Sequence, residues 1–436
     1  MRGRTLGHAA RSAGRTLLGT ACAVVLSCAA PAAADRTFDF GEGPARPGYT
    51  RVAPQTAYDG KLGYGFLPAS ASNSPAVFAA DVPEGDYDVT VRLGDPSRAT
   101  LTTVTAESRR LLLNRVQAAP GQSVARTFTV NVRKPAIQGG GVTGLKDREK
   151  GPPPVPDWDG LLTVAFHGPQ AGVTSLEIAP APSAITVFVA GDSTVTDQAR
   201  GPYFGWGQML PRFFRRGVSF SNQAESGLAL HSFEGQRRLK KILSMMKKGD
   251  YLFIQFGHND QKDKSKGAGP FTSYKANLKR YVAAAREKGG LPVLVTPMER
   301  RRWKEGRPRQ TLADYAQAVR QVGEEEGVPV IDLHAMSLSF YAALGEDKSK
   351  QAFVFYPANT FPGQDKALED NTHHSAYGAF ELARCVAEGI RAQVPELAKS
   401  LAEDAGSFDP ARPDAPESEE IPNGLAVGSA EKPAGS

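Results

Sequence analysis

The chain has 436 residues, more than one ordinary hydrophobic core encloses, so its length favours two domains. Its 41% hydrophobic and 22% charged residues are typical of a soluble globular protein rather than a disordered or fibrous one. The net charge of +6 depends on four arginines in the acid-free residues 1–34; without them 48 basic and 46 acidic side chains leave +2, which does not indicate a nucleic-acid partner.

Residues 1–34 are predicted to be an export signal peptide. Basic residues precede the apolar stretch Leu17–Leu26, and Ala32-Ala33-Ala34 offers small residues for cleavage. The apolar stretch is too short to cross a bilayer as a stable anchor, so we expect a secreted, extracellular protein. Lipid attachment at Cys28 stays open as an alternative, although Leu26-Ser27 is a poor lead-in to such a site.

Cleavage after Ala34 leaves Cys385 as the only cysteine, so no internal disulfide can form. Its position in a predicted helix favours a buried, inert thiol over a nucleophile. The fold is therefore expected to depend on its hydrophobic cores.

Residues 35–180 are predicted to form an antiparallel β-sandwich. The segment "DYDVTVRL" alternates apolar and polar side chains with the period of a half-buried strand, and "FTVNV" and "LLTVAFH" repeat the pattern. Many short strands separated by turn residues indicate a sandwich. The Gly/Pro-rich stretch 139–156 is expected to be a long surface loop of this domain, and residues 179–184 a linker.

Residues 185–400 are predicted to form an α/β domain with a parallel sheet in three layers. The segments "ITVFVA", "YLFIQF", "PVLVTP" and "VPVIDL" are nearly continuous apolar runs, as expected for strands buried on both faces. Between them, apolar stripes at helical spacing follow Thr272 and run through Leu312–Val322. Residues 401–436 contain few large apolar side chains and are predicted to be a disordered tail.

Polar residues follow three of the predicted strands. Gly191-Asp192-Ser193-Thr194 follows "ITVFVA", "QAESGLAL" with Gly227 follows "VSFSN", and "GHND" with Asn259 follows "YLFIQF". Since ligands bind at the carboxyl ends of parallel strands, these loops are expected to meet at one edge of the sheet.

Each of these loops supplies something that acyl transfer requires. The Ser193 hydroxyl can be the nucleophile, and the backbone amides of Ser193 and Gly227 with the Asn259 side chain can stabilise an oxyanion. In "DNTHHS", Asp370 and His373 can hydrogen-bond within a tight turn that leads into a helix from about Ala376. The far imidazole nitrogen of His373 is then free for Ser193.

These four blocks, "GDST", the glycine of "NQAESGLAL", "GHND" and "DNTH", resemble those of the SGNH (GDSL-like) hydrolases. Over residues 185–395 the chain is most similar to the rhamnogalacturonan acetylesterases, carbohydrate esterases with Thr after the serine and a D-x-T-H block. The resemblance implies Ser193 as nucleophile, His373 as base and Asp370 as the residue that orients it. It also implies Ser193, Gly227 and Asn259 as oxyanion donors.

The leading domain, with "FDFGEGP", "GYGF" and "ESRRLLL", is similar to galactose-binding-like modules that precede some of these esterases. Two departures from the family pattern affect expected substrate contacts. Leu228 stands where relatives often have a basic residue, and His374 is an additional histidine.

Each motif also has a structural interpretation. A lone "GDS" occurs in ordinary turns, and "GHND" or "DNTHHS" can simply cap a helix. Their joint occurrence in this order favours catalysis. The other histidines are expected to be structural (His258, and His334 paired with Asp332) or at the surface (His231).

The basic stretch 299–309, "ERRRWKEGRPR", is most simply a solvated loop; binding of carboxylates on an acidic sugar polymer is the alternative. No metal site is indicated, because the chain has neither an H-E-x-x-H motif nor a cysteine cluster.

The sequence therefore predicts a secreted serine esterase that removes acetyl groups from a pectic polysaccharide, with rhamnogalacturonan implied by the resemblance. No cofactor is needed, and an acetylated polysaccharide is the expected partner. An α/β-hydrolase is disfavoured because Ser193 lies in G-D-S-T-V, not in a G-x-S-x-G elbow. A GDSL-type lipase or general esterase, and a carbohydrate-binding protein with an inert hydrolase domain, remain as alternatives.

Overall fold

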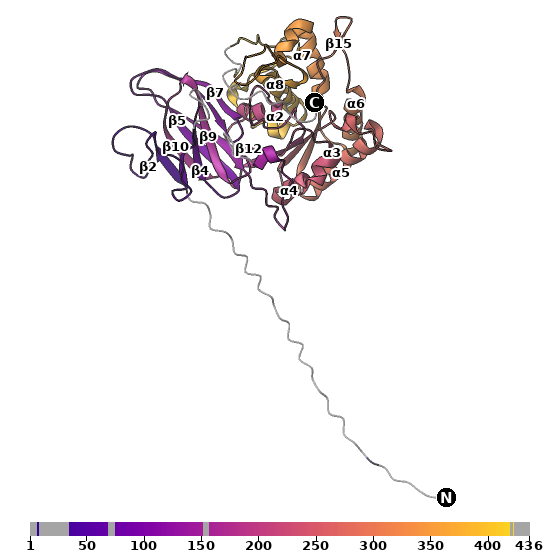
Figure 1. Cartoon of the computed structure of the whole chain (residues 1–436). Helices are drawn as coiled ribbons and strands as arrows, with labels where there is room; N and C mark the ends of the chain where they lie inside the picture. The colour runs from indigo at the N-terminus through magenta and orange to yellow at the C-terminus, as the bar shows by residue number, and fades with distance from the viewer. Residues whose placement is uncertain (1–6, 8–34, 69–74, 151–156, 419–421, 423–436) are drawn as a thin grey trace. The chain divides into compact units, whose positions relative to one another are not determined.

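A computed structural model describes Gly7 and residues 35–68, 75–150, 157–418 and 422 (Figure 1). Apart from Gly7, the predicted signal peptide lies outside these residues, and its cleavage and the secretion of the protein stay predictions. The residues described from 35 onward belong to one compact unit, Ala33–Ser436. Within the described part of the chain, no helix has the length and apolar character needed to cross a bilayer.

Among the described residues before 181, ten strands form two five-stranded sheets. Their bounds are β1 Arg36–Asp39, β2 Thr50–Arg51, β3 Tyr64–Phe66, β4 Ala76–Asp81, β5 Gly85–Leu93, β6 Thr100–Ala106, β7 Arg110–Ala118, β8 Val124–Val132, β9 Leu161–Gln170 and β10 Val173–Pro180. One sheet has the order β2-β1-β10-β5-β8 and the other β3-β4-β9-β6-β7. All neighbours are antiparallel except β1 and β2.

The two sheets share one hydrophobic core. Val89 and Val91 of β5 are buried in it, as their alternation with polar residues predicts, beside Phe78 and Leu162 of the other sheet. This is a β-sandwich, called the N-terminal sandwich below. Strand β10 continues to Pro180, so the stretch expected to be a linker begins inside a strand. The likeness to galactose-binding modules stays a prediction.

The second part of the chain contains a five-stranded parallel sheet with the order β12-β11-β13-β14-β17. Its strands are β11 Ile185–Gly191, β12 Val218–Asn222, β13 Tyr251–Gln255, β14 Leu291–Val295 and β17 Val330–Ile331. The shorter elements outside this sheet are α1 Asp147–Lys150, η1 Leu210–Phe213, η2 Asp260–Lys262, η3 Pro270–Tyr274, β15 Trp303–Lys304, β16 Arg307–Pro308, η4 Ser349–Ala352, β18 Phe353–Tyr356, β19 Leu368–His374, α9 Pro395–Ala398 and η5 Glu403–Ala405.

Helices cover both faces of the parallel sheet (Figure 1). On one face lie α2 Trp206–Met209, α7 Leu333–Lys348 and α8 Ala376–Gln393; on the other lie α3 Leu230–Gly235, α4 Arg238–Met245, α5 Lys275–Glu287 and α6 Ala313–Glu326. Successive side chains of β11 enter the two cores in turn: Val187 and Val189 enter one, and Phe188 and Ala190 the other. The predicted three-layer α/β fold is confirmed.

Two predictions about loops differ from the structure. Residues 401–418, expected to begin a disordered tail, pack on α8: the Arg384 guanidinium lies 4.4 Å from the Phe408 ring centroid, and the Tyr377 hydroxyl donates to the Asp414 carbonyl at 2.8 Å. Most of the remaining tail lies outside the described residues. The expected surface loop 139–156 contains α1 and a buried residue, Thr143.

Candidate active site

Ser193, His373 and Asp370 form a continuous row of hydrogen bonds. The Ser193 Oγ lies 2.9 Å from His373 Nε2, and His373 Nδ1 lies 2.8 Å from Asp370 Oδ2. All three residues are at most 4% exposed. The arrangement is that of a hydroxyl beside an imidazole whose second nitrogen is oriented by a carboxylate.

Asp370 and His373 can hydrogen-bond although they are only three residues apart, because β19 bulges between them. Val354 of β18 pairs with Asp370, whereas the adjacent Phe353 pairs with His374, so residues 371–373 have no direct strand partners. The Asp370 Oδ1 accepts hydrogen bonds from the backbone amides of Thr372 (2.8 Å) and His373 (3.0 Å). The expected tight turn is therefore an insertion within a strand, and α8 starts at Ala376 as predicted.

The environment of Asp370 favours the carboxylate. Burial acts to raise the pKa of Asp370, but the hydrogen bond and charge of His373 and the two backbone donors hold it well below its usual range. The edge of the Tyr203 ring faces the His373 imidazole, with 5.9 Å between ring centroids.

Ser193 lies directly after β11, in a turn fixed by its neighbours. The Asp192 Oδ1 accepts from the backbone amide of Thr194 (2.9 Å) and from its hydroxyl (2.8 Å). The Gln198 amide donates to the Ser193 carbonyl at 2.8 Å and to the Ser226 hydroxyl at 3.3 Å. The sequence did not predict this role of Gln198, because no local pattern indicates a glutamine that bonds to both the Ser193 loop and the Gly227 loop.

The loops that carry Gly227 and Asn259 contact one another. Asn259 Nδ2 donates to the Leu228 carbonyl at 3.1 Å, and the Asp260 carboxyl accepts from the amides of Leu230 (3.0 Å) and Gly257 (3.1 Å). Gly227 has a φ of +79°, a conformation that favours glycine. Burial raises the pKa of Asp260 to about 7.

The other histidines that the structure describes lie outside the Ser193 row. His374 is buried and its Nε2 lies 3.0 Å from the Tyr341 hydroxyl. His258 is buried with its Nδ1 3.5 Å from Asp192 Oδ2, and burial lowers its pKa. His231 is exposed and borders a cavity of about 380 Å³.

The expected pairing of His334 with Asp332 is wrong. His334 Nε2 lies 3.2 Å from Glu299 Oε2, while Asp332 accepts from Arg320 and caps the start of α7. The apolar pattern places Asp332 and His334 at the end of a strand. It does not show that the carboxylate beside His334 is that of Glu299, which comes from another loop.

The basic stretch 299–309 has two parts with different surroundings. Glu299 and Arg301 are buried; Arg301 donates to Asn371 Oδ1 (3.0 Å), and Arg300 donates to the His258 carbonyl (3.2 Å). The remainder forms the β15–β16 hairpin with four exposed cations, Arg302, Lys304, Arg307 and Arg309. This hairpin is thereby joined to the segments that carry Asn259 and His373.

Cys385 is fully buried in α8, and burial raises the pKa of its thiol well above the ordinary value. Among the residues that the structure describes, no group of three or more His, Cys, Asp or Glu side chains is arranged to hold a metal ion.

The chain is similar to known esterases. A model of the GDSL-like lipase/acylhydrolase family matches residues 189–357. Over 209 residues the chain is 44% identical to the rhamnogalacturonan acetylesterase RhgT of Bacillus subtilis (strain 168), an alignment that covers 47% of this chain and 89% of RhgT. It is 36% identical over 223 residues to YesY, a probable rhamnogalacturonan acetylesterase of the same organism. That alignment covers 49% of this chain and 96% of YesY.

A crystal structure of YxiM from Bacillus subtilis is also similar, with 25% identity and a TM-score of 0.45, covering 82% of this chain and 98% of that chain. The family match includes Ser193, Gly227 and Asn259, and RhgT is aligned over most of its length. The chain therefore belongs to the GDSL-like lipase/acylhydrolase family and is a carboxylic ester hydrolase.

Proposed function

We propose that the protein is a secreted serine esterase that removes acetyl groups from pectic rhamnogalacturonan. The observation that carries the catalytic part is the row of hydrogen bonds from Ser193 Oγ through His373 to Asp370, at 2.9 and 2.8 Å. A serine hydroxyl becomes an effective nucleophile when a positioned base takes its proton.

In the proposed first step, Ser193 Oγ attacks the acetyl carbonyl carbon while His373 Nε2 accepts the hydroxyl proton. The Asp370 carboxylate holds the imidazole in the required tautomer and stabilises the imidazolium that forms. The low pKa of Asp370 supports this role, because the carboxylate stays ionised throughout.

The negative charge that develops on the carbonyl oxygen requires hydrogen-bond donors that are already in place. We assign this role to the backbone amides of Ser193 and Gly227 and to the Asn259 side chain. His373 then protonates the leaving sugar hydroxyl. A water molecule, deprotonated by the same imidazole, releases acetate from the acyl-serine and restores the Ser193 hydroxyl.

The substrate assignment is supported by the relatives and by surface charge. RhgT is a rhamnogalacturonan acetylesterase, and YesY is a probable rhamnogalacturonan acetylesterase. The four exposed cations of the β15–β16 hairpin suit a polysaccharide that carries carboxylates. Export is proposed from the basic and apolar pattern of residues 1–34 alone.

Replacement of the nucleophile tests the catalytic part. Ser193→Ala is expected to lower kcat on p-nitrophenyl acetate by at least about 10⁴-fold, because the acyl-serine can no longer form. Ser273→Ala, at an exposed serine before α5, is the matched control and should keep full activity. Retention of wild-type activity by Ser193→Ala would contradict the mechanism.

The substrate is tested separately with the wild-type protein. Acetate release should be greater from acetylated rhamnogalacturonan than from acetylated xylan, and p-nitrophenyl esters should be hydrolysed more slowly as the acyl chain lengthens. A preference for chains well beyond acetyl would favour a lipase, and binding of acetylated pectin without turnover would favour an inert hydrolase domain.

A further inference from the structure

Two segments of the N-terminal sandwich contact the loops that carry the proposed catalytic groups. The first is the segment 107–110, made of the turn between β6 and β7 and the first residue of β7, which contacts the loop 192–198 that follows β11. The second is the segment 146–149, which contacts the loop that carries Gly227. Both segments come from the part of the chain that has no role in the proposed chemistry.

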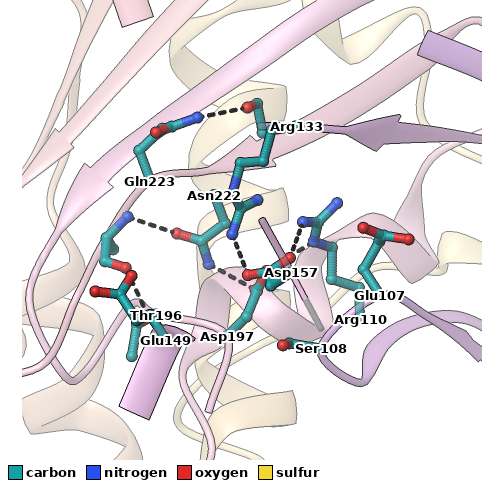
Figure 2. Close-up of polar contacts among 12 residues, drawn as sticks. Glu107, Ser108, Arg110, Arg133, Glu149, Asp157, Thr196, Asp197, Asn222 and Gln223 are labelled. Carbon is teal, nitrogen blue, oxygen red and sulfur yellow. Dashed lines mark hydrogen bonds and ion pairs between the residues drawn. The ribbon is translucent and has the colours of Figure 1, made fainter. Parts of the chain in front are cut away.

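Arg110 contributes the most deeply buried contact of the first segment. Its Nε donates to Asp197 Oδ2 at 2.7 Å, and its Nη2 donates to Asp157 Oδ1 at 2.9 Å (Figure 2). Its Nη1 donates to the Phe220 carbonyl of β12 at 3.1 Å. Burial acts to lower the pKa of Arg110, but Asp197 and Asp157 raise it above its ordinary value, so the guanidinium stays charged.

Asp197 connects Arg110 to the backbone that follows Ser193. Its Oδ1 accepts from Asn222 Nδ2 at 2.7 Å (Figure 2). The same amide group donates to the Val195 carbonyl at 2.9 Å. Arg110, Asp197 and Asn222 therefore fix the backbone two to four residues after the proposed nucleophile.

Arg109 contacts two residues, Gln198 and Phe204, that in turn contact the segments carrying Ser193 and His373. Its Nη1 donates to the Gln198 carbonyl at 3.1 Å, and the Gln198 side chain holds the Ser193 carbonyl at 2.8 Å. Its guanidinium carbon lies 4.0 Å from the Phe204 ring centroid, and the Phe204 amide donates to the His374 carbonyl at 3.0 Å. Gln198 therefore links Arg109 to Ser193, and Phe204 links it to His374, the residue after the proposed base.

The turn itself adopts an unfavourable backbone conformation. Glu107 and Arg109 have φ values of +53° and +61°, in the left-handed region that residues other than glycine rarely occupy. Such a conformation costs free energy and persists only where surrounding contacts compensate for it.

The second segment contacts the peptide group that carries the proposed oxyanion donor. Lys146 Nζ and Arg148 Nη2 both donate to the Ser226 carbonyl oxygen, the latter at 3.0 Å, and Arg148 Nε donates to Glu225 Oε1 at 2.8 Å. The Ser226 carbonyl and the Gly227 N–H belong to one peptide unit. Because hydrogen bonds along a peptide polarise one another, two cations on this oxygen orient the Gly227 N–H and strengthen it as a donor.

We propose that the N-terminal sandwich is part of the hydrolytic machinery: Arg109 and Arg110 position the Ser193 loop, and Lys146 and Arg148 hold and polarise the Ser226–Gly227 peptide. These four are positioning residues, because they act through the groups beside Ser193 and Gly227: Arg109 and Arg110 bond to Gln198 and Asp197, and Lys146 and Arg148 bond to the Ser226 carbonyl. The inference rests on the proposed function, in which Ser193 attacks and the Gly227 amide stabilises the oxyanion.

The test uses the full chain and a substrate too small to need a polysaccharide-binding surface. In the double variant Lys146→Met/Arg148→Met, kcat on p-nitrophenyl acetate should fall about 10-fold, with KM within about twofold, because a donor is weakened rather than removed. Second-order labelling of Ser193 by an organophosphate should slow by a similar factor. Arg110→Lys, which keeps the charge but loses the forked geometry, should also lower kcat.

Arg216→Met is the matched control, because it removes an ion pair with Asp88 (2.6 Å) that joins the sandwich to the parallel sheet at the amino end of β12. Its kcat should match the wild type. Arg148 is partly exposed, so the double variant should remain folded even if Arg110→Lys does not, and thermal unfolding checks each protein.

A double variant with kcat and labelling rate within twofold of the wild type overturns the inference. So does a variant that changes only KM on acetylated rhamnogalacturonan, since that identifies the sandwich as a substrate-binding module. Ser193→Ala separates the two hypotheses: if it is inactive while the positioning variants are normal, the proposed function stands and this inference fails.

Discussion

At the scale of single residues, the proposed chemistry depends on an imidazole placed between a hydroxyl and a carboxylate. The Asp370 carboxylate has two tasks, since Oδ2 orients His373 and Oδ1 accepts two backbone amides. These tasks can be separated, because an asparagine side chain can perform the second but not the first.

Asp370→Asn is expected to lower kcat on p-nitrophenyl acetate by about 10³–10⁴-fold with little change in KM, because the amide favours the wrong histidine tautomer. Thermal unfolding near pH 7 should change much less than kcat, since the Asn carbonyl oxygen can still accept the two backbone bonds. Asp365→Asn, at an exposed aspartate nearby, is the control. An Asp370→Asn variant within tenfold of the wild-type kcat contradicts the orienting role.

Residue identities at the site were predictable because each lies at a strand end or in a short motif. The sequence predicted that Ser193, Asp370 and His373 meet, and their atoms lie within hydrogen-bond distance. It did not predict Gln198 or the pairing of His334 with Glu299, because such contacts join segments whose register no local pattern encodes.

At the scale of elements, the proposed base depends on how β18, β19 and α8 pack together. Gly378 in the first turn of α8 lies against the backbone of Ala352, which immediately precedes β18. A Cβ atom at Gly378 would lie 1.9 Å from the Ala352 carbonyl oxygen, so α8 and the β18–β19 pair approach as closely as they do only with glycine there.

Gly378→Ala is therefore expected to destabilise the protein by about 1–3 kcal/mol or more, as overpacking does, and to lower kcat by displacing β19. Urea unfolding and p-nitrophenyl acetate hydrolysis measure the two effects. Gly235→Ala is the matched control, because a Cβ there has nothing within 4 Å, and its stability should be unchanged or slightly higher. Equal stability of the Gly378 variant and the wild type would exclude the close contact.

Strand and helix positions were largely predictable from apolar periodicity, as β5, β11 and α5 illustrate. The bulge in β19 was not, because it arises from pairing with β18, a segment that carries no motif of its own. The ordered stretch 401–418 was missed for a related reason. Its contacts to Tyr377 and Arg384 come from the Asp414 backbone carbonyl and the Phe408 ring in a polar segment rather than from a periodic apolar face.

At the scale of the whole molecule, the sandwich and the parallel sheet share buried ionisable groups. Glu107 is 2% exposed, accepts from the Thr163 amide at 3.0 Å, and lies in the same turn as Arg110. Burial raises the pKa of Glu107 to about 8. No sequence pattern predicts that Arg110 donates to the Phe220 carbonyl of β12, because the two residues lie 110 positions apart along the chain.

The raised pKa makes stability depend on pH in a defined direction. Between the ordinary value of 4.5 and about 8 the folded state holds a proton on Glu107 that the unfolded state has released, so this contribution falls as pH rises through that window. Each unit of pKa difference corresponds to about 1.4 kcal/mol. Glu107→Gln keeps the acceptor for Thr163 and removes the titration.

We expect Glu107→Gln to match the wild type near pH 5 and to be more stable by about 1–3 kcal/mol near pH 8. Urea unfolding at both pH values measures the difference in free energy of unfolding between the variant and the wild type. Contributions from other titrating groups cancel in this difference, because both proteins contain them. Parallel stability curves for the two proteins would show that Glu107 is ionised in the folded state.

The separation of 180 positions between Ser193 and His373 has a consequence for biosynthesis. A ribosome adds Ser193 to the growing chain well before it adds His373. Until then the chain holds a serine without the proposed base beside it, so the proposed ester cleavage has to await translation beyond His373.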